Sequence, residues 1–287
     1  MRNDYQHITV TPIAGSLGAE IGNVDLAADN PEGVYSEIHR ALLENLVIFF
    51  RDQNITPDQQ LAFARRWGDL HQHPFMKGME DYPDILEIKK LPTDKKNFGG
   101  GWHSDQMFAP KPAMGTILLA RETPDAGGDT LFANMYDAYD ALSDGMKKML
   151  DGMKAVSSGD NFKQDGGKSR KEVYGKYHTM QVRDPDPKER TTNAHPVVRT
   201  HPETGRKALY AGGHWRHFEG MTEAESEPLM TFLREHSTRP EFTCRFRWRP
   251  GSIAFWDNRC TQHFAIDDYP GKTRVMHRIT VCGDEPF

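Results

Sequence analysis

The clearest pattern in the sequence reads Phe242-Thr243-Cys244-Arg245-Phe246-Arg247-Trp248, and after Pro250-Gly251 it continues as Ser252-Ile253-Ala254-Phe255-Trp256. In the first stretch every second residue is apolar, which is typical of a strand with one buried face. The apolar run in the second stretch is typical of a strand that is more deeply buried. Proline followed by glycine favours a turn between the two. The region therefore predicts a β hairpin within a β-rich fold.

Shorter segments of both strand and helix character precede this region. Two predicted helices open with capping-box sequences, Thr56-Pro57-Asp58-Gln59 and Thr222-Glu223-Ala224-Glu225, in which side chains satisfy the first backbone N–H groups of a helix. We therefore expect a mainly β fold with flanking helices. Apolar spacing predicts helices at 31–46, 56–67, 135–153 and 222–236, and strands at 8–13, 17–21, 46–50, 85–88, 115–120, 130–132, 197–199 and 208–210.

The length of 287 residues is compatible with one large domain, because β barrels with added helices reach this size undivided. We expect residues 1–287 to form a single domain. The polar tract 157–194 is too long for a simple connection and is predicted to be a lid or an insertion. The sequence contains no Gly-x-Gly-x-x-Gly or Walker-type loop, which argues against nucleotide-binding α/β folds.

Charge and composition argue against several classes of protein. The 36 lysines and arginines against 41 aspartates and glutamates give a net charge of −5, so the long-range field offers little to nucleic acid. No apolar stretch reaches the ~18 residues that a membrane span needs, and the first residues have no apolar core resembling a signal peptide. The three cysteines form no Cys-x-x-Cys pair, which suits a reducing compartment. We expect a cytoplasmic protein that binds neither nucleic acid nor membrane.

A candidate metal-binding pair lies in Trp102-His103-Ser104-Asp105, directly after three glycines. Residues i and i+2 of an extended chain point to the same face, so His103 and Asp105 can direct an imidazole nitrogen and a carboxylate oxygen to one point. Alone, the pair is weak support for a metal site, because a turn histidine beside a solvated aspartate gives the same pattern. Its interpretation depends on a second part of the chain.

That second part is Trp256-Asp257-Asn258-Arg259-Cys260-Thr261-Gln262-His263, followed by Arg274 and Arg278. Two histidines and one carboxylate on one face of iron leave three positions open, which is the arrangement of non-haem Fe(II) oxygenases. A 2-oxo acid fills two of these positions and O₂ needs the third. The far carboxylate of 2-oxoglutarate then requires a fixed, two-pronged cation, and Arg274 fits this role.

Several ordered motifs together resemble the taurine dioxygenase and 2,4-dichlorophenoxyacetate dioxygenase family, from about Ile8 to the end of the sequence. Such enzymes have a double-stranded β-helix (jelly-roll) core, so the resemblance implies that fold here. The motifs are Trp102-His103-Ser104-Asp105, Gly127-Gly128-Asp129-Thr130, His195-Pro196-Val197-Val198-Arg199-Thr200-His201-Pro202, Trp256-Asp257-Asn258-Arg259, Thr261-Gln262-His263 and Met276-His277-Arg278.

The resemblance also implies the roles of individual residues. It suggests His103, Asp105 and His263 as ligands of Fe(II). It implies Thr130 and Arg274 as partners of the C5 carboxylate of 2-oxoglutarate, and Arg278 as a cation beside the iron-bound end of 2-oxoglutarate and the acid group of the substrate. The implied reaction hydroxylates a small organic acid with O₂ and releases succinate and CO₂. We also expect a homo-oligomer, either a dimer or a tetramer.

The substrate side shows one match to the family and several departures from it. Leu70-His71-Gln72-His73-Pro74 resembles the segment whose histidine before proline reaches the acid group, which implies His73 as a substrate contact. Where taurine dioxygenase holds the amine with a tyrosine and an Asp-Asn pair, this chain has Met76 and the pair Phe98 and Gly99. A buried ammonium group would lack partners here. The sequence therefore favours an apolar or aromatic acid, such as an aryloxyalkanoate or a sulfonate, over taurine.

Two other functions fit part of the same pattern. Two histidines and an aspartate also bind zinc, so a zinc-dependent hydrolase is an alternative, although it needs no arginine pair for a dicarboxylate. A non-catalytic jelly-roll binding module is the second alternative. Trp256, His195, His201 and His277 are interpreted as structural residues.

Overall fold

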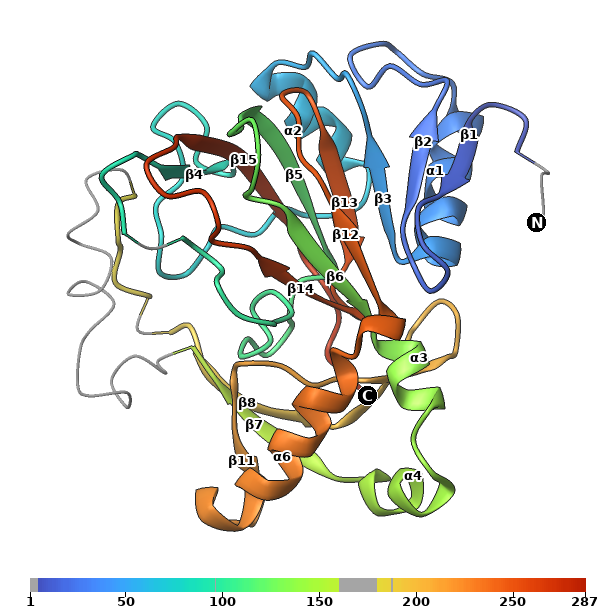
Figure 1. The fold of residues 1–287 in the computed structure, drawn as a ribbon, viewed down its shortest axis with the longest axis vertical. Coiled ribbons are helices and arrows are strands. Elements are labelled where there is room, and N and C mark those ends of the chain that lie inside the picture. The colour runs from blue at the N-terminus through green and yellow to red at the C-terminus, as the bar shows by residue number, and fades with distance from the viewer. Residues whose placement is uncertain (1–4, 96, 160–179, 187) are drawn as a thin grey trace.

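A computed structural model describes residues 5–95, 97–159, 180–186 and 188–287 of the protein. The largest sheet among these residues has seven strands (Figure 1). The strand order is β1-β2-β3-β13-β5-β15-β4, and every neighbouring pair is antiparallel except the parallel pair β2 and β3. The strands are β1 (Thr9–Pro12), β2 (Ala19–Gly22), β3 (Val47–Phe50), β4 (Leu86–Lys90), β5 (Gly115–Glu122), β13 (Ile253–Asp257) and β15 (Arg274–Val281).

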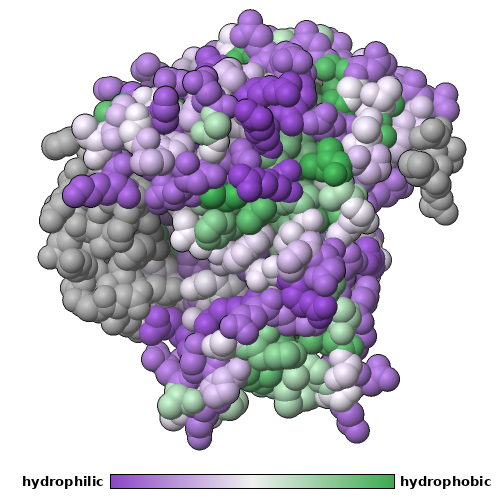
Figure 2. All heavy atoms as spheres, in the orientation of Figure 1, coloured by the Kyte–Doolittle hydropathy of each residue, from purple (hydrophilic) through white to green (hydrophobic). Residues whose placement is uncertain are grey.

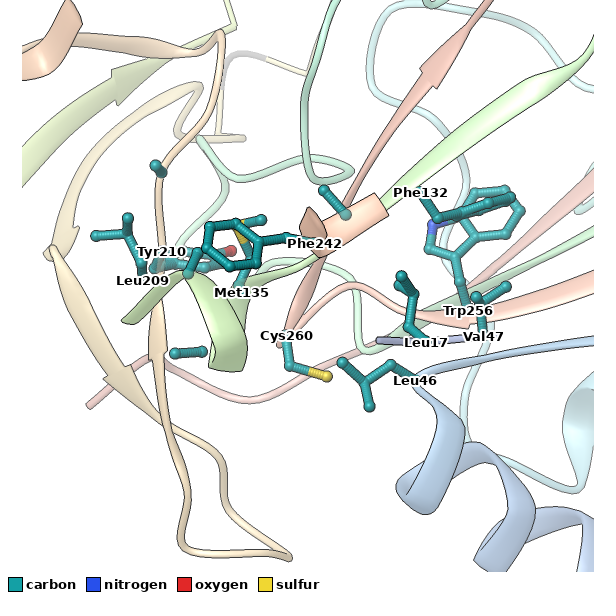
Figure 3. Close-up of a cluster of buried hydrophobic side chains, with 14 of the residues drawn as sticks. Leu17, Leu46, Val47, Phe132, Met135, Leu209, Tyr210, Phe242, Trp256 and Cys260 are labelled. Atoms are coloured by element: carbon teal, nitrogen blue, oxygen red, sulfur yellow. The ribbon is translucent and has the colours of Figure 1, made fainter. Parts of the chain in front are cut away.

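A second sheet packs against the middle of the first. It consists of β12 (Thr243–Phe246), β6 (Thr130–Asn134) and β14 (Thr261–Ala265), in the order β12-β6-β14. Phe49 of β3 stacks on Phe246 of β12 with the ring centres 3.9 Å apart. Phe132 of β6 lies 5.5 Å from the ring of Trp256 in β13, and Figure 3 shows these two side chains together. The main core therefore fills the space between the two sheets.

Two helices cover the outer face of the large sheet. The buried side of α1 (Glu32–Asn45) and that of α2 (Pro57–Arg65) belong to one apolar cluster with Ile48 and Phe255. The capping box at Thr56 is present in the structure, with the side chain of Gln59 returning to the backbone N–H of Thr56. The large sheet is therefore covered by the small sheet on one side and by these helices on the other.

The remaining elements form the lower part of the molecule in Figure 1, where α6 lies along β7, β8 and β11. Phe218 of β11 and Leu233 of α6 are buried in the main apolar cluster, so this part is continuous with the core. The elements are α3 (Met135–Asp140), α4 (Asp144–Leu150), α6 (Glu223–Ser237), the short 3₁₀ helix η2 (Pro240–Phe242), the sheet β11 (Trp215–Phe218), β7 (Lys154–Ser158) and β8 (Thr192–Pro196), and the pair β9 (Val198–Thr200) and β10 (Lys207–Leu209).

The prediction of a hairpin at 242–256 is wrong, although both of its strands form. β12 pairs with β6, whereas β13 pairs with β3 and β5. Directly after the turn, the N–H of Gly251 donates to the carbonyl of Ala120 and the N–H of Ala120 donates to the carbonyl of Ser252, both at 2.9 Å. The chain therefore joins β5 and passes from one sheet to the other. This change of layer explains why β13 is buried along its whole length while Arg245 of β12 is exposed.

Other departures from the sequence prediction are local. The helical stretch at 135–153 forms two helices, α3 and α4, because Ser143 caps a new helix start. Strands β7, β8, β11, β14 and β15 are not among the predicted strands. The tract 157–194 begins in β7 and ends in β8, and its residues 160–179 and 187, on which the lid prediction mainly falls, lie outside the described residues.

Apolar side chains appear on the surface of Figure 2 as patches between hydrophilic ones. Among the described residues, the large apolar side chains that are exposed are Ile13, Met149, Met221, Phe232 and Phe287. None of the described helices has both the length and the apolar character that crossing a membrane requires.

Candidate metal centre

Three side chains with metal-binding atoms converge between the two sheets. The Nε2 atoms of His103 and His263 lie 3.7 and 3.8 Å from Oδ1 of Asp105. Each of the three side chains offers one ligand atom, and these three atoms all lie within 4.8 Å of one another. Such a set of two imidazoles and one carboxylate could hold a divalent transition metal and leave several of its positions open.

Backbone pairing brings the two histidines together. His103 and His263 form an isolated antiparallel bridge, with their N–H groups donating to each other's carbonyls at 3.1 and 2.9 Å. Nδ1 of His103 lies 2.7 Å from the carbonyl oxygen of Gly101. A carbonyl can only accept, so Nδ1 carries the hydrogen and the lone pair of Nε2 faces Asp105. This is the tautomer that a metal ligand needs.

The carboxylate of Asp105 is almost completely buried, with 2% of its residue surface exposed. Burial alone raises the pKa of a carboxyl group. Arg278, whose Nη2 lies 2.9 Å from Oδ1, and the two histidines together lower the pKa of Asp105 by more than burial raises it. The pKa of Asp105 is therefore held well below its usual value. Burial, the neighbouring imidazole of His103 and the guanidinium of Arg278 also lower the pKa of His263. Both groups are thus in the unprotonated form that binds metal.

A pocket opens beside these three residues, between β5, β13 and β15 on one side and β6 and β14 on the other. It contains both arginines and the threonine that the sequence pattern singled out. Its lining is Ile88, Phe98, Gly99, His103, Leu118, Thr130, Trp256, His263, Ala265, Arg274 and Arg278.

Arg274 is a buried cation whose hydrogen-bonding capacity is largely unused. Its residue surface is 4% exposed, and its Nε and Nη2 atoms have no hydrogen-bond partner among the described residues. Gly128, with φ +70°, passes so close that an added Cβ would lie 3.2 Å from the Arg274 Cδ. A buried guanidinium without partners is costly, so the pocket is suited to a ligand that carries a carboxylate.

Thr130 stands on β6, across the pocket from the arginines. Its Oγ1 accepts a hydrogen bond of 2.9 Å from Nε1 of Trp248, and the guanidinium of Arg274 lies 5.8 Å from the centre of the same indole ring. Since Oγ1 accepts from Trp248, the hydroxyl hydrogen of Thr130 is available to a ligand oxygen. Thr130 and Arg274 could therefore bind the same carboxylate.

Two of the three other predicted substrate residues lie close together at this site. The rings of His73 and Phe98 are 6.0 Å apart, and Phe98 lines the pocket. Met76 is 1% exposed and is packed in a small cluster with Leu86 and Met180, against which Phe98 rests. Met76 therefore supports Phe98 from behind and does not itself line the pocket.

Three further residues, Phe75, Phe108 and His214, extend this pair into a row of rings, and the sequence analysis assigned a role to none of them. Successive ring centres from His73 to Phe75, Phe108, His214 and His103 are 6.2, 5.7, 5.1 and 6.1 Å apart. Phe98, which lies beside His73, and His103 both line the pocket, so both ends of this row of rings lie at the pocket. The positions of Phe75 and Phe108, shortly after two recognised motifs, were the available signal.

A second group of His, Asp and Cys residues lies elsewhere in the core. His201, Asp257 and Cys260 are all buried, with ligand atoms within 4.8 Å of one another. The Nε2 of His201 lies 3.0 Å from Oδ2 of Asp257, and Arg259 donates to both oxygens of Asp257 at 2.9 and 2.7 Å. This group is therefore engaged in internal hydrogen bonds.

Comparisons with known proteins agree with this geometry. The family model "Taurine catabolism dioxygenase TauD, TfdA family" matches residues 9–280. An alpha-ketoglutarate-dependent (2-oxoglutarate-dependent) sulfate ester dioxygenase of Pseudomonas putida is 34% identical over 97% of this chain and 91% of its own. The alpha-ketoglutarate-dependent 2,4-dichlorophenoxyacetate dioxygenase of Cupriavidus pinatubonensis is 33% identical over 96% of this chain and 98% of its own. The crystal structure of a taurine dioxygenase from Burkholderia xenovorans has a TM-score of 0.81 and 33% identity, covering 98% of this chain and 91% of the other. The chain therefore belongs to the TauD, TfdA family of 2-oxoglutarate-dependent dioxygenases.

Proposed function

We propose that this enzyme binds Fe(II) through His103, Asp105 and His263 and uses 2-oxoglutarate and O₂ to hydroxylate a small organic acid. The observation that carries the proposal is that the three metal-binding side chains and the buried, unpartnered Arg274 line or adjoin one pocket. One end of 2-oxoglutarate can therefore bind the metal held by these side chains, and its far carboxylate can bind Arg274. A zinc hydrolase or a binding module would have no use for such a cation.

The roles of the protein groups follow from their positions. Arg274 and the hydroxyl of Thr130 bind the C5 carboxylate of 2-oxoglutarate and orient its other end towards the metal ligands. Arg278, beside Asp105, supplies positive charge near the C1 carboxylate and the acid group of the substrate. The iron supplies the oxidising chemistry, and 2-oxoglutarate leaves as succinate and CO₂. The apolar walls formed by Ile88 and Leu118 exclude water.

The substrate is proposed to be an acid with an apolar or aromatic body, such as an aryloxyalkanoate, an alkyl sulfate or a sulfonate. Support comes from the apolar pocket residues Ile88, Phe98 and Leu118 and from the adjoining row of rings formed by His73, Phe75, Phe108 and His214. Burial of an alkyl or aryl group there gains about 25 cal/mol for each Å² removed from water. His73 at the rim is the proposed contact for the acid group. The relative from Pseudomonas putida is named for sulfate esters and the one from Cupriavidus pinatubonensis for 2,4-dichlorophenoxyacetate, which are compounds of this kind.

We further propose that the two facing sheets are the two halves of a double-stranded β-helix (jelly roll) and that the chain is a single domain. Antiparallel pairing throughout the small sheet, and in all but one pair of the large sheet, supports the jelly roll. The apolar cluster that includes Phe49, Trp256 and Phe218 runs through both parts of the molecule and supports a single domain.

A panel of acids tests the proposal directly. Succinate release is measured with an alkyl sulfate, an aryloxyacetate and taurine, each with Fe(II), with Zn(II) and with no metal. We expect release to require Fe(II) and to be stimulated more by the first two acids than by taurine. His73→Ala should raise the KM for the best acid more than that for 2-oxoglutarate. Turnover with Zn(II) alone would refute the iron proposal, and taurine as the best substrate would refute the substrate proposal.

A further inference from the structure

Three buried residues, Asp105, Thr116 and Asn258, form a closed ring of hydrogen bonds behind the metal-facing side of Asp105, and Trp256 donates into this ring. Thr116 of β5 donates its hydroxyl to Oδ2 of Asp105 at 2.6 Å. Asn258 donates from Nδ2 to the Thr116 hydroxyl oxygen at 3.0 Å and accepts at Oδ1 from the backbone N–H of Asp105 at 3.1 Å. Trp256 also donates to Oδ1 of Asn258, at 3.1 Å. All four residues are at most 2% exposed, so water does not compete for these bonds.

The direction of each bond is fixed by chemistry. Oδ1 of Asn258 faces two N–H donors, from Asp105 and Trp256, so a flipped amide would place donor against donor. The Nδ2 of Asn258 must therefore point to Thr116. The hydroxyl oxygen of Thr116 accepts that bond, and its hydrogen is directed to Oδ2 of Asp105.

The two oxygens of Asp105 are thereby made unequal. Oδ2 is occupied by Thr116. Oδ1 faces the Nε2 atoms of both histidines at 3.7 and 3.8 Å and also lies 2.9 Å from Nη2 of Arg278. A carboxylate can bind a metal through one oxygen or through both. Binding through both would use a coordination position that a 2-oxo acid or O₂ requires. A hydroxyl that holds Oδ2 away from the metal preserves that position.

We propose that Thr116, oriented by Asn258, is a positioning residue that makes Asp105 a one-oxygen ligand and so keeps the metal open to 2-oxoglutarate. The inference rests on the proposed function, because it assumes that Asp105 binds Fe(II). A purely structural role for the ring would affect folding in the absence of metal. The positioning role instead affects what happens once metal is added.

The test compares Thr116→Val, which removes the hydroxyl and keeps the branched shape, with Thr116→Ser, which keeps the hydroxyl. The Kd for Fe(II) is measured anaerobically by competition with a chelator. The Kd for 2-oxoglutarate is then measured at saturating Fe(II) from the visible absorption of the ternary complex. We expect Thr116→Val to bind Fe(II) about 10–100-fold more weakly, as is typical when the hydrogen-bond partner of a ligand is lost. It should also bind 2-oxoglutarate more weakly, and Thr116→Ser should stay close to wild type.

Thermal unfolding of the metal-free proteins is the control for folding. If Thr116→Val does not fold, Thr116→Ala and Thr116→Ser provide the same comparison, because they differ by the hydroxyl oxygen alone. Equal Kd values for both ligands in the hydroxyl and non-hydroxyl variants would overturn the positioning role. Failure of the wild-type protein to bind Fe(II) and 2-oxoglutarate would instead overturn the proposed function, so the two failures are distinguishable.

Discussion

Two buried clusters in this protein have nearly the same composition but different bonding. In one, His103, Asp105 and His263 direct atoms to a shared space. In the other, Nδ1 of His201 accepts the backbone N–H groups of residues 203 and 204, each at 3.2 Å, and its Nε2 donates to Asp257. Every ring nitrogen of His201 is therefore used within the protein, and Asp257 is further held by Arg259.

The same contrast separates two arginines. Arg259 is buried and binds Asp257 and Glu203, whereas Arg274 is buried with Nε and Nη2 unpartnered among the described residues. Residue type and burial are alike in both cases. A binding site is therefore defined by donors and acceptors that the fold leaves unused, since satisfied groups have nothing to offer a ligand.

The largest expected effect comes from deleting a metal ligand. We predict that His103→Ala or His263→Ala abolishes Fe(II) binding and turnover while the fold persists, because one histidine and one carboxylate retain little affinity for the metal. His201→Ala is the matched control and should retain the wild-type Kd for Fe(II). Equal losses of Fe(II) affinity in all three variants would erase the distinction between the clusters.

Breaking the satisfied cluster should affect stability instead. Asp257→Ala leaves the buried Arg259 without its main partner, and we expect a loss of about 3–5 kcal/mol in the free energy of unfolding. Chemical denaturation measures this loss. The folded fraction of Asp257→Ala should still bind Fe(II). If Asp257→Ala were as stable as wild type, Arg259 would not need Asp257 as a partner.

Arg274 should respond in the opposite way to Arg259. Arg274→Lys is predicted to raise the KM for 2-oxoglutarate about 10-fold or more, because an ammonium cannot replace a two-pronged hydrogen-bonded pair whose single bonds contribute roughly 1.5–3 kcal/mol. The KM for the organic acid should change little. In Arg259→Lys, stability should fall and both KM values should stay near wild type. An unchanged KM for 2-oxoglutarate in Arg274→Lys would assign the carboxylate to another residue.

The smallest effect concerns pH and the outer end of the satisfied cluster. The hydrogen bond with His39, at 2.8 Å, and the cation Arg259 lower the pKa of Glu203 from 4.5 to about 2. Because the pKa is lower in the folded state, the stabilisation is complete above pH 4.5 and is lost as the pH falls towards 2. Glu203→Gln should therefore lose stability less steeply over this interval in denaturation experiments. Glu203 is partly exposed, so the difference from wild type should be modest.

Local spacing was sufficient to predict many of the strands and to pair His103 with Asp105, whereas the proposal of His263 as the third ligand came from the resemblance to the family. Alternation identifies a strand, and the i, i+2 rule brings His103 and Asp105 to one face. Pairing between strands depends on distant segments, and for that reason the predicted hairpin at 242–256 was wrong. Likewise, no local pattern relates Thr116 to Asp105 or His214 to Phe108, since these contacts exist only after the sheets have packed.

The placement of β15 has a consequence for how the enzyme is made. This strand lies between β4 and β5 and carries Arg274 and Arg278, yet it is synthesised after both neighbours. Until it inserts, β4 and β5 each present an open edge, and the insertion must close a long stretch of chain. Before β15 inserts, the large sheet is incomplete and the cations proposed to bind the co-substrate are not in place. Iron acquired before that step would meet a half-formed centre, so loading of the metal is expected to follow the insertion of β15.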